Sequence, residues 1–308
     1  MSADIATTAV TPAIGHGHPT AATAAAGDRA AAAHPATAHA GTAAQPTSEH
    51  WAKIWRAAWP KLLAIGIFVA LWQLVYLAGW KPPYVLPSPV TVIQNFGALV
   101  MQPEFWQAVT NTLRRAVTGF TVAVAIGSAI GVAVAKSKVL RAGVGSLITG
   151  LQTMPSIVWF PLAILFFGLT EQAIFFVVVL GAAPSIANGI IAGIDHVPPS
   201  YSRLGKVLGA GPAALYRHVI LPAALPSYVQ GLSQGWAFAW RSLMAGELLV
   251  IIEGKPSLGG RLSFAQEFGN APQLMAYMIV IVILGMLADA FFSSASRRMR
   301  AKRGLATD

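Results

Sequence analysis

Long runs of apolar residues restrict how this chain can fold more than any other feature. Six such segments lie at about residues 62–80, 116–135, 145–167, 172–194, 226–250 and 272–292. Each is close to the roughly 20 residues that an α-helix needs to cross the hydrocarbon core of a bilayer. A helix satisfies its own backbone hydrogen bonds in lipid, whereas an open strand does not. We therefore expect an all-α, polytopic membrane protein with about six transmembrane helices.

The composition agrees with a membrane protein. Of the 308 residues, 55% are apolar and only 10% are charged, whereas a soluble domain carries roughly 25% charged residues. The net charge of +10 would suit nucleic acid, but the basic residues form short clusters between the apolar segments, as membrane topology requires. We expect no nucleic-acid partner. The chain has no cysteine, which excludes disulfides and thiolate chemistry, and we expect no metal site.

The two ends of the chain differ from the apolar body. Residues 1–50 are rich in Ala, Thr and His and have few large apolar side chains, so we expect a disordered, dispensable cytoplasmic tail. Five of the seven histidines lie there, and a solvated tail is favoured over a metal-binding one. Trp51, Trp55 and Trp59 predict an interfacial helix at residues 51–61. Residues 62–300 form the predicted transmembrane domain, and residues 301–308 form a second cytoplasmic tail.

The distribution of Lys and Arg predicts the orientation. If the N-terminus is cytoplasmic, the inner segments hold fourteen basic residues and the outer segments hold five. Cytoplasmic loops of membrane proteins carry the excess of Lys and Arg. We therefore expect both termini to be cytoplasmic, which also makes residues 195–226 cytoplasmic.

This inner loop, residues 195–226, is the longest one. Pro198 and Pro199 are expected to open a short helix that ends at Leu208, and Gly209 breaks it. Pro212 starts a second short helix, to Val219. The pattern predicts a helix–turn–helix that projects from the membrane, and a connector that touches no partner is the alternative.

Three positions within the apolar segments are unusual. Pro155 and Pro161 are expected to kink the third segment, which makes it either a wall of a transport path or a structural bend. Arg241 lies roughly 21 Å into the fifth segment at the helical rise. A buried Arg usually faces a cavity or a partner. We expect it either to bind an anion or to form a structural ion pair, with Glu247 of a second copy or with a lipid headgroup.

The inner loop resembles the Glu-Ala-Ala motif of ATP-binding-cassette import permeases. Leu208, Gly209 and Ala210 match the glycine core of that motif, and the segment 219–222 (VILP) matches its closing element. The segment 203–205 (RLG) replaces the usual Glu-Ala-Ala.

Other segments resemble the sulfonate, taurine and nitrate branch of this family. They are LPSP at 86–89, MPS with WFPL at 154–162, NG at 188–189 and WAFAWRSLMAGE at 236–247. The resemblance covers about residues 62–300.

The resemblance implies the function and the partners. The chain would be the permease subunit of a bacterial cytoplasmic-membrane importer, pairing with a second copy of itself, a cytoplasmic ATPase and an external substrate-binding protein, within membrane lipid. It would move a small anion, such as an alkylsulfonate, taurine or nitrate, by alternating access. The chain has no G-x-x-x-x-G-K-[ST] motif, so ATP and Mg²⁺ belong to the partner ATPase, and the permease is not an enzyme.

The resemblance also assigns roles to residues. The ATPase-coupling loop comprises Arg203, Leu204, Gly205, Lys206, Leu208, Gly209, Ala210 and Tyr216. The translocation path comprises Pro155, Trp159, Pro161, Asn188, Trp240, Arg241 and Glu247.

Two other functions are considered. A secondary transporter driven by an ion gradient would have internal repeats and charged relays within the membrane, and neither is evident. An intramembrane enzyme would need paired carboxylates, a Ser/His pair or metal ligands at membrane depth. His196 and His218 both fall in the inner loop, and no carboxylate pair shares an apolar segment.

Overall fold

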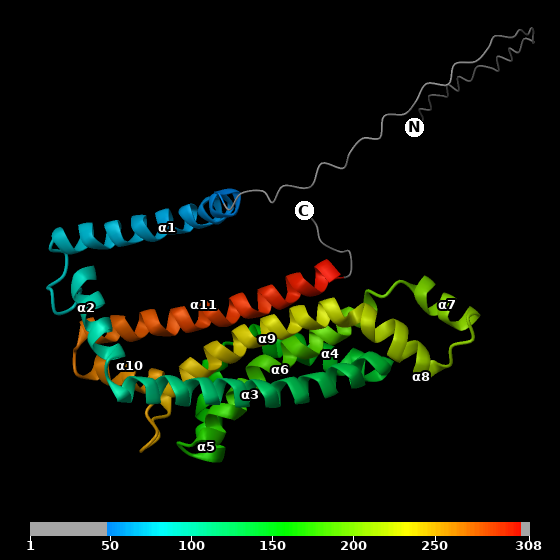
Figure 1. Ribbon diagram of the computed structural model, residues 1–308. Coiled ribbons are helices and arrows are strands. Elements are labelled where there is room, and N and C mark those ends of the chain that lie inside the picture. Colours follow the sequence, from blue (N-terminus) through cyan, green and yellow to red (C-terminus); the bar gives the residue numbers. More distant parts are fainter. Residues whose placement is uncertain (1–47, 303–308) are drawn as a thin grey trace, which may run out of the picture. The chain divides into compact units, whose positions relative to one another are not determined.

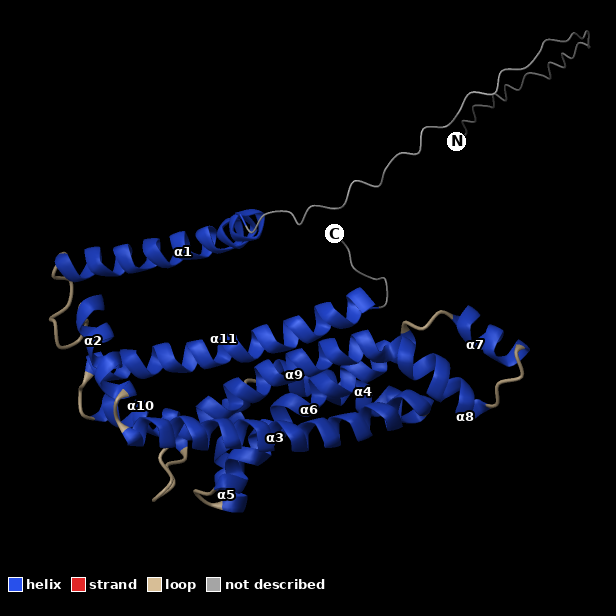
Figure 2. Ribbon diagram, in the orientation of Figure 1, coloured by secondary structure: helices blue, strands red, loops and turns tan. Residues whose placement is uncertain are grey.

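The structure, a computed structural model, describes residues 48–302, and every regular element in that range is a helix (Figure 1, Figure 2). The chain divides into two compact units between Ala58 and Trp59. The arrangement described below is that of the unit that begins at Trp59. The predicted tails lie outside the described residues, except for their innermost few positions.

The first helix, α1 (Ser48–Leu77), passes through Pro60 without interruption. The predicted interfacial helix at 51–61 and most of the predicted first span at 62–80 are therefore parts of one continuous helix. A proline removes one backbone donor and strains the preceding turn, but in α1 the helix continues on both sides of it. The apolar part of α1 is Ala58–Leu77, and none of its most apolar stretch is buried inside the structure.

Within residues 48–302, four helices are long and apolar enough to cross a membrane. They are Ala58–Leu77 in α1, α3 (Pro103–Lys136), α6 (Glu171–Asp195) and Ala271–Met299 in α11 (Ala271–Lys302). A fifth span results if α4 (Lys138–Thr153) is joined with the bent segment Ser156–Phe167. The remaining predicted span corresponds to α9 (Leu221–Leu249). It is long enough, but its Ser, Gln, Arg and Glu residues lower its hydropathy, and it packs against α3, α6, α10 and α11.

Helix α6 lies at the centre of the bundle, between α3 and α9 (Figure 1). The main hydrophobic core combines buried side chains of α3, α5, α6 and α9, among them Phe160, Ile174 and Leu243. Glycines bring the helices close together. A Cβ atom added to Gly127 of α3 would lie 2.6 Å from the carbonyl oxygen of Ala183. Close approach through small residues is the usual way in which helices pack in lipid.

The third apolar segment is broken. Helix α4 ends at Thr153, a 3-10 turn η1 (Ser156–Trp159) follows, and α5 (Phe160–Phe167) leaves at a bend of 104°. The predicted interruption at Pro155 is thus a full break. The predicted kink at Pro161 is wrong, because this residue lies in the first turn of α5, where a missing backbone N–H has no cost.

The long helices run between two ends of the bundle (Figure 1). The short helices α7 (Pro199–Val207) and α8 (Pro212–Leu215) lie at one end, here called the α7 end. The helices α2 (Pro89–Val100) and α10 (Leu258–Glu267) lie at the other, the α10 end. A π-helical turn, η2 (Tyr216–Ile220), connects α8 directly to α9.

Candidate coupling surface and translocation cavity

The turn after α7 has the geometry that the sequence predicts. Gly209 has a φ of +79°, a conformation that side chains with a Cβ atom rarely adopt. Its N–H donates to the carbonyl of Lys206, and the N–H of Ala210 donates to the carbonyl of Gly205. These two bonds form a Schellman cap, which satisfies the last carbonyls of α7. The second short helix differs from the prediction, since α8 and η2 run on into α9 rather than ending at Val219.

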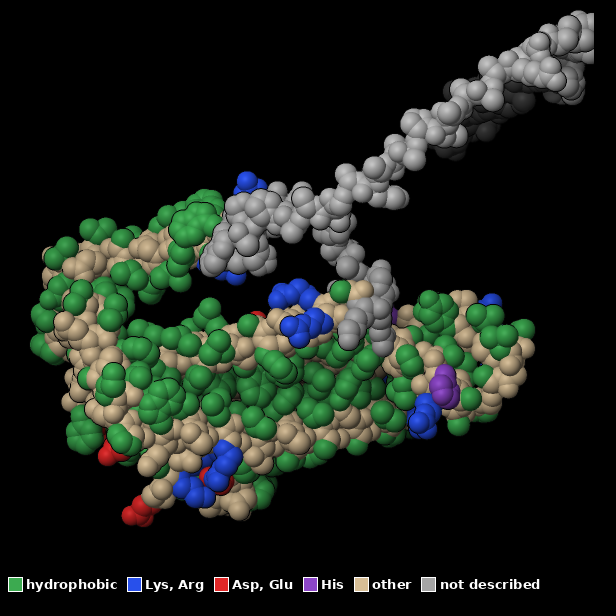
Figure 3. Space-filling model, viewed as in Figure 1, with side chains coloured by type: hydrophobic (Ala, Val, Ile, Leu, Met, Phe, Trp, Pro, Cys, Tyr) green, Lys and Arg blue, Asp and Glu red, His purple; other side chains and the backbone are tan. Residues whose placement is uncertain are grey.

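Helix α7 exposes a row of large apolar side chains. Leu204, Val207 and Leu208 are 59%, 83% and 75% exposed, respectively, and Arg203 and Lys206 are also exposed. Figure 3 shows hydrophobic side chains over this end of the molecule. We call the three apolar side chains with Arg203 and Lys206 the α7 surface. Exposed apolar patches are found at sites of contact with other proteins or with a membrane.

Two of the predicted coupling residues, Gly205 and Tyr216, pack against neighbouring elements at the α7 end. Gly205 is buried, and a Cβ atom added there would lie 2.5 Å from Cδ1 of Leu215, so α7 packs closely on α8. Tyr216 is half-buried in η2, with the Nζ atom of Lys136 5.9 Å from the centre of its ring. The loop is therefore anchored to the end of α3.

A cavity of about 300 Å³, with both polar and apolar lining residues, lies where α4 breaks. The break itself supplies Gln152, Pro155 and Ser156, and α9 supplies Phe238 and Arg241. Arg241 is exposed rather than buried, and its guanidinium carbon lies 5.6 Å from the centre of the Phe238 ring. Of the predicted path residues, Pro155 and Arg241 are thus brought together.

Asn188 acts on the same cavity indirectly. Its Nδ2 donates to Oε1 of Gln152 at 2.8 Å, and Nε2 of Gln152 donates to the hydroxyl of Ser185 at 2.8 Å. Two side chains of α6 therefore hold the amide of Gln152 at the cavity wall.

The other predicted path residues lie apart from the lining of this cavity. Trp159 packs against the main hydrophobic core, and Pro161 is exposed at the start of α5. Trp240 stacks on Trp236 with ring centres 6.4 Å apart, and its Nε1 would lie 3.0 Å from a Cβ atom on Gly285 of α11.

Glu247 is the clearest correction to the sequence analysis. Its side chain is 0% exposed, and Oε1 lies 3.1 Å from Nη1 of Arg115 in the same chain. Its carboxylate also accepts hydrogen bonds from the hydroxyl of Thr112 at 2.8 Å and the N–H of Gly259 at 3.1 Å. The expected pair between Glu247 and Arg241 of a second copy is therefore wrong, because Arg115 already neutralises this carboxylate.

Arg115 extends the same network to α6. Its Nε atom donates to Oε1 of Glu171 at 3.2 Å, and Lys255 and Arg114 lie 3.4 and 3.8 Å from the same oxygen. We call Arg115, Glu247, Thr112 and Glu171 the α10-end cluster. It joins α3, α6, α9 and the start of α10.

Sequence reasoning missed Arg115, Thr112 and Gln152. Arg115 is one of the five basic residues that the predicted orientation places in outer segments, since it precedes the apolar segment at 116–135. In the structure α3 begins at Pro103, twelve residues earlier, so Arg115 is inside a helix. The signal that could have suggested the pair of Arg115 and Glu247 is the presence of one basic and one acidic residue in two otherwise apolar helices.

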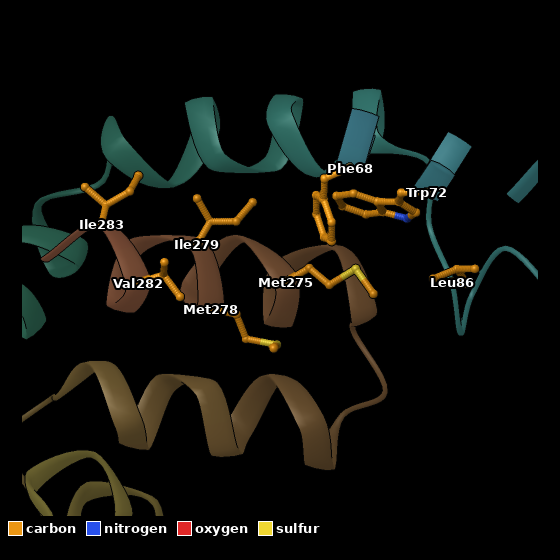
Figure 4. Close-up of a pocket in the computed structure, with 8 residues that line it drawn as sticks. All are labelled: Phe68, Trp72, Leu86, Met275, Met278, Ile279, Val282 and Ile283. Carbon is orange, nitrogen blue, oxygen red and sulfur yellow. The ribbon is translucent and has the colours of Figure 1, made fainter. Parts of the chain in front are cut away.

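A second hollow, of about 490 Å³, is lined only by apolar side chains (Figure 4). Phe68 and Trp72 of α1 lie on one side of it, and residues of α11 such as Met275 and Ile279 lie on the other. This lining offers a charged solute no hydrogen bond, unlike the cavity at the α4 break.

Comparison with known proteins decides the family. Residues 123–301 match the family described as the binding-protein-dependent transport system inner membrane component. The chain belongs to this family. The family predicted from the motifs is thereby confirmed, and as a member the chain is a permease subunit of an ATP-binding-cassette importer rather than an enzyme.

Individual relatives agree with this assignment. The putative aliphatic sulfonates transport permease protein SsuC of Escherichia coli (strain K12) is 31% identical over 233 residues, covering 75% of this chain and 86% of the relative. The taurine transport system permease protein TauC of the same organism is 28% identical over 262 residues, covering 81% and 94%. Both belong to the branch that the sequence motifs indicate.

A solved structure supports the fold. A bacterial ABC transporter involved in the import of the acidic polysaccharide alginate matches with a TM-score of 0.56 at 13% identity, covering 81% of this chain and 99% of that chain. The importer-permease fold is therefore confirmed.

The family also places the protein and its partners. This importer permease is a multi-pass inner-membrane protein, and its family implies an ATPase partner and a substrate-binding protein. Within the described residues, no group of three or more His, Asp or Glu side chains is arranged to hold a metal ion.

Proposed function

We propose that this permease imports a small organic anion, such as an alkylsulfonate or taurine, or an inorganic anion such as nitrate, by alternating access. It works as a homodimer in membrane lipid, and a cytoplasmic ATPase binds ATP and Mg²⁺. The α7 surface docks on that ATPase. Both termini and the α7 end are cytoplasmic, and an external substrate-binding protein delivers the anion to the α10 end.

The observation that carries the proposal is the α7 surface. Three large apolar side chains are exposed on a short helix beyond the long helices of the bundle, on a turn that Gly209 and its Schellman cap fix in shape. A patch that faces neither lipid nor the core of its own chain needs a protein partner.

Charge supports the orientation. Lys136, Lys138 and Arg141 lie at the junction of α3 and α4, and Arg297 and Arg298 lie near the end of α11. These positions are at the α7 end (Figure 1). The excess of Lys and Arg on one side is typical of the cytoplasmic side.

Two other features support the substrate class and the dimer. The relatives whose names specify a sulfonate or taurine support an anionic substrate. The apolar stretch of α1 has no residue buried within its own chain, which supports its burial by lipid or by a second copy.

Cysteine cross-linking tests the coupling surface directly. The chain has no native cysteine, so single cysteines placed along residues 203–216 report only their own positions. We expect those at Leu204, Val207 and Leu208 to cross-link to the co-expressed ATPase and one at buried Gly205 to fail. If no cysteine in this range reaches the ATPase, the proposal is overturned, and an ion-gradient transporter becomes the better reading.

Two glycines offer a matched pair for the same surface. Gly209 and Gly211 both have open space around an added Cβ atom, but only Gly209 has a positive φ, since Gly211 has a φ of −66°. Gly209→Val should therefore strain the turn by about 1–2 kcal/mol and lose ATPase binding and uptake together, whereas Gly211→Val should retain both. Equal behaviour of the two variants in co-purification would show that the turn does not set the docking geometry.

A further inference from the structure

Arg241 has no counter-ion among the residues that the structure describes. Among residues 48–302, no carboxylate oxygen lies within 4.0 Å of its guanidinium group, and the other charged residue of α9, Glu247, is taken by Arg115. Arg241 lies roughly 12 Å before the end of α9 at the helical rise. A cation at such depth is costly unless it faces a cavity or a partner. A counter-ion for Arg241 therefore has to come from outside residues 48–302.

The cavity beside Arg241 offers further hydrogen-bond donors. Gln152 uses one N–H of its amide for Ser185, and a second N–H remains on the same nitrogen. The hydroxyl of Ser156 makes no hydrogen bond within the described residues, and it lines the same cavity. The remaining wall includes Pro155 and Phe238, which suit the carbon part of a small solute.

We propose that this cavity binds the acidic group of the transported solute, and that this group is a sulfonate or a similarly small monoanion. The inference rests on the proposed importer function and names the site of its substrate. Arg241 supplies the charge, and Gln152 and Ser156 donate to the remaining oxygens. A sulfonate has three acceptor oxygens and no donor, so it matches a site built of one cation and neutral donors. A charge-assisted hydrogen bond is also stronger than a neutral one.

A binding experiment tests this site with defined probes. The permease, purified with its ATPase in nanodiscs of neutral phosphatidylcholine, is titrated with ethanesulfonate in a calorimeter. We expect Arg241→Gln to weaken binding by about tenfold or more and Gln152→Leu to weaken it less. Arg114→Gln is the matched control, since this arginine is 62% exposed at the other end of the bundle. We expect this variant to bind ethanesulfonate with the affinity of the unmodified protein.

Three results would overturn the inference. One is equal affinity for ethyl methyl sulfone, which resembles the probe but has no charge. Another is competition by phosphatidylglycerol in the nanodisc, which would identify a lipid phosphate as the occupant. The third is no binding of ethanesulfonate or nitrate at millimolar concentration. The cross-linking of residues 203–216 to the ATPase does not depend on this site, so it separates a failure of the anion site from a failure of the importer function.

Discussion

The bundle contains two arginines in deep positions, and their surroundings differ completely. Arg115 is 2% exposed and contacts the carboxylates of Glu247 and Glu171. Arg241 is exposed, lines the cavity at the α4 break and lies beside the ring of Phe238. Both lie in helices that cross the bundle, yet among the described residues only Arg115 has carboxylate partners.

The difference separates an arginine that carboxylates of its own chain neutralise from one that has no ion pair among the described residues. Burying an ion is costly, and good geometry with further hydrogen bonds is needed to offset that cost. Glu247 has such geometry, since Arg115, Thr112 and Gly259 all donate to it. Arg241 has no such set of partners, and this makes it available to a ligand. The following predictions, ordered by the size of their expected effect on stability, test this contrast.

Removing the buried carboxylate should have the largest effect. In Glu247→Gln, Arg115 keeps Glu171 but loses its most buried partner, so we expect a destabilisation of about 3 kcal/mol, the lower end for breaking a buried pair. Thermal unfolding of the purified permease in detergent measures it. A melting temperature equal to that of the unmodified protein would mean that the α10-end cluster does not stabilise the fold.

Crowding the same carboxylate should have the next largest effect. A Cβ atom on Gly259 would lie 2.4 Å from Cβ of Glu247 and 3.0 Å from its carbonyl carbon. Gly259→Ala should therefore push α10 away from α9 and cost about 1–3 kcal/mol, as overpacking does. Gly143→Ala is the control, because an added Cβ atom there meets nothing within 4 Å. Equal unfolding temperatures for the two variants would contradict the close contact.

An exposed ion pair should matter much less than the buried one. Arg141 and Asp195 lie 2.7 Å apart, but their side chains are 40% and 41% exposed. We expect Asp195→Asn to lower the free energy of unfolding by less than about 1 kcal/mol. The same unfolding assay, repeated at high salt, checks this value, and a loss as large as that of Glu247→Gln would show that exposure does not distinguish the two pairs.

Arg241 itself should contribute almost nothing to stability. The guanidinium group of Arg241 forms no ion pair within the described residues. The free energy of unfolding of Arg241→Gln should therefore differ from that of the unmodified protein by less than about 0.5 kcal/mol, as is usual for surface substitutions. It should also co-purify with the ATPase. A variant that fails to assemble would instead give Arg241 a structural role at the subunit interface.

The α7 surface shows how much local sequence can predict. Pro199 and Pro212 each begin a short helix, and Gly209 has the positive φ between them. These features depend on backbone preferences of single residues, which are properties of the local chain. The break at Pro155 is a similar case, although its angle of 104° was not foreseeable, since packing of α5 sets it.

The sequence by itself determined the helical membrane fold, the family and the position of the two short helices on either side of Gly209, because apolar length and turn residues act over a few neighbouring positions. Only the tertiary structure decided which charges belong together. Arg115 and Glu247 are 132 positions apart, and Gln152 meets Asn188 across 36. Such pairs depend on how α3, α4, α6 and α9 pack in three dimensions. Two charged residues on one helix, Arg241 and Glu247, look equivalent in the sequence, but the neighbouring helices neutralise one and leave the other open.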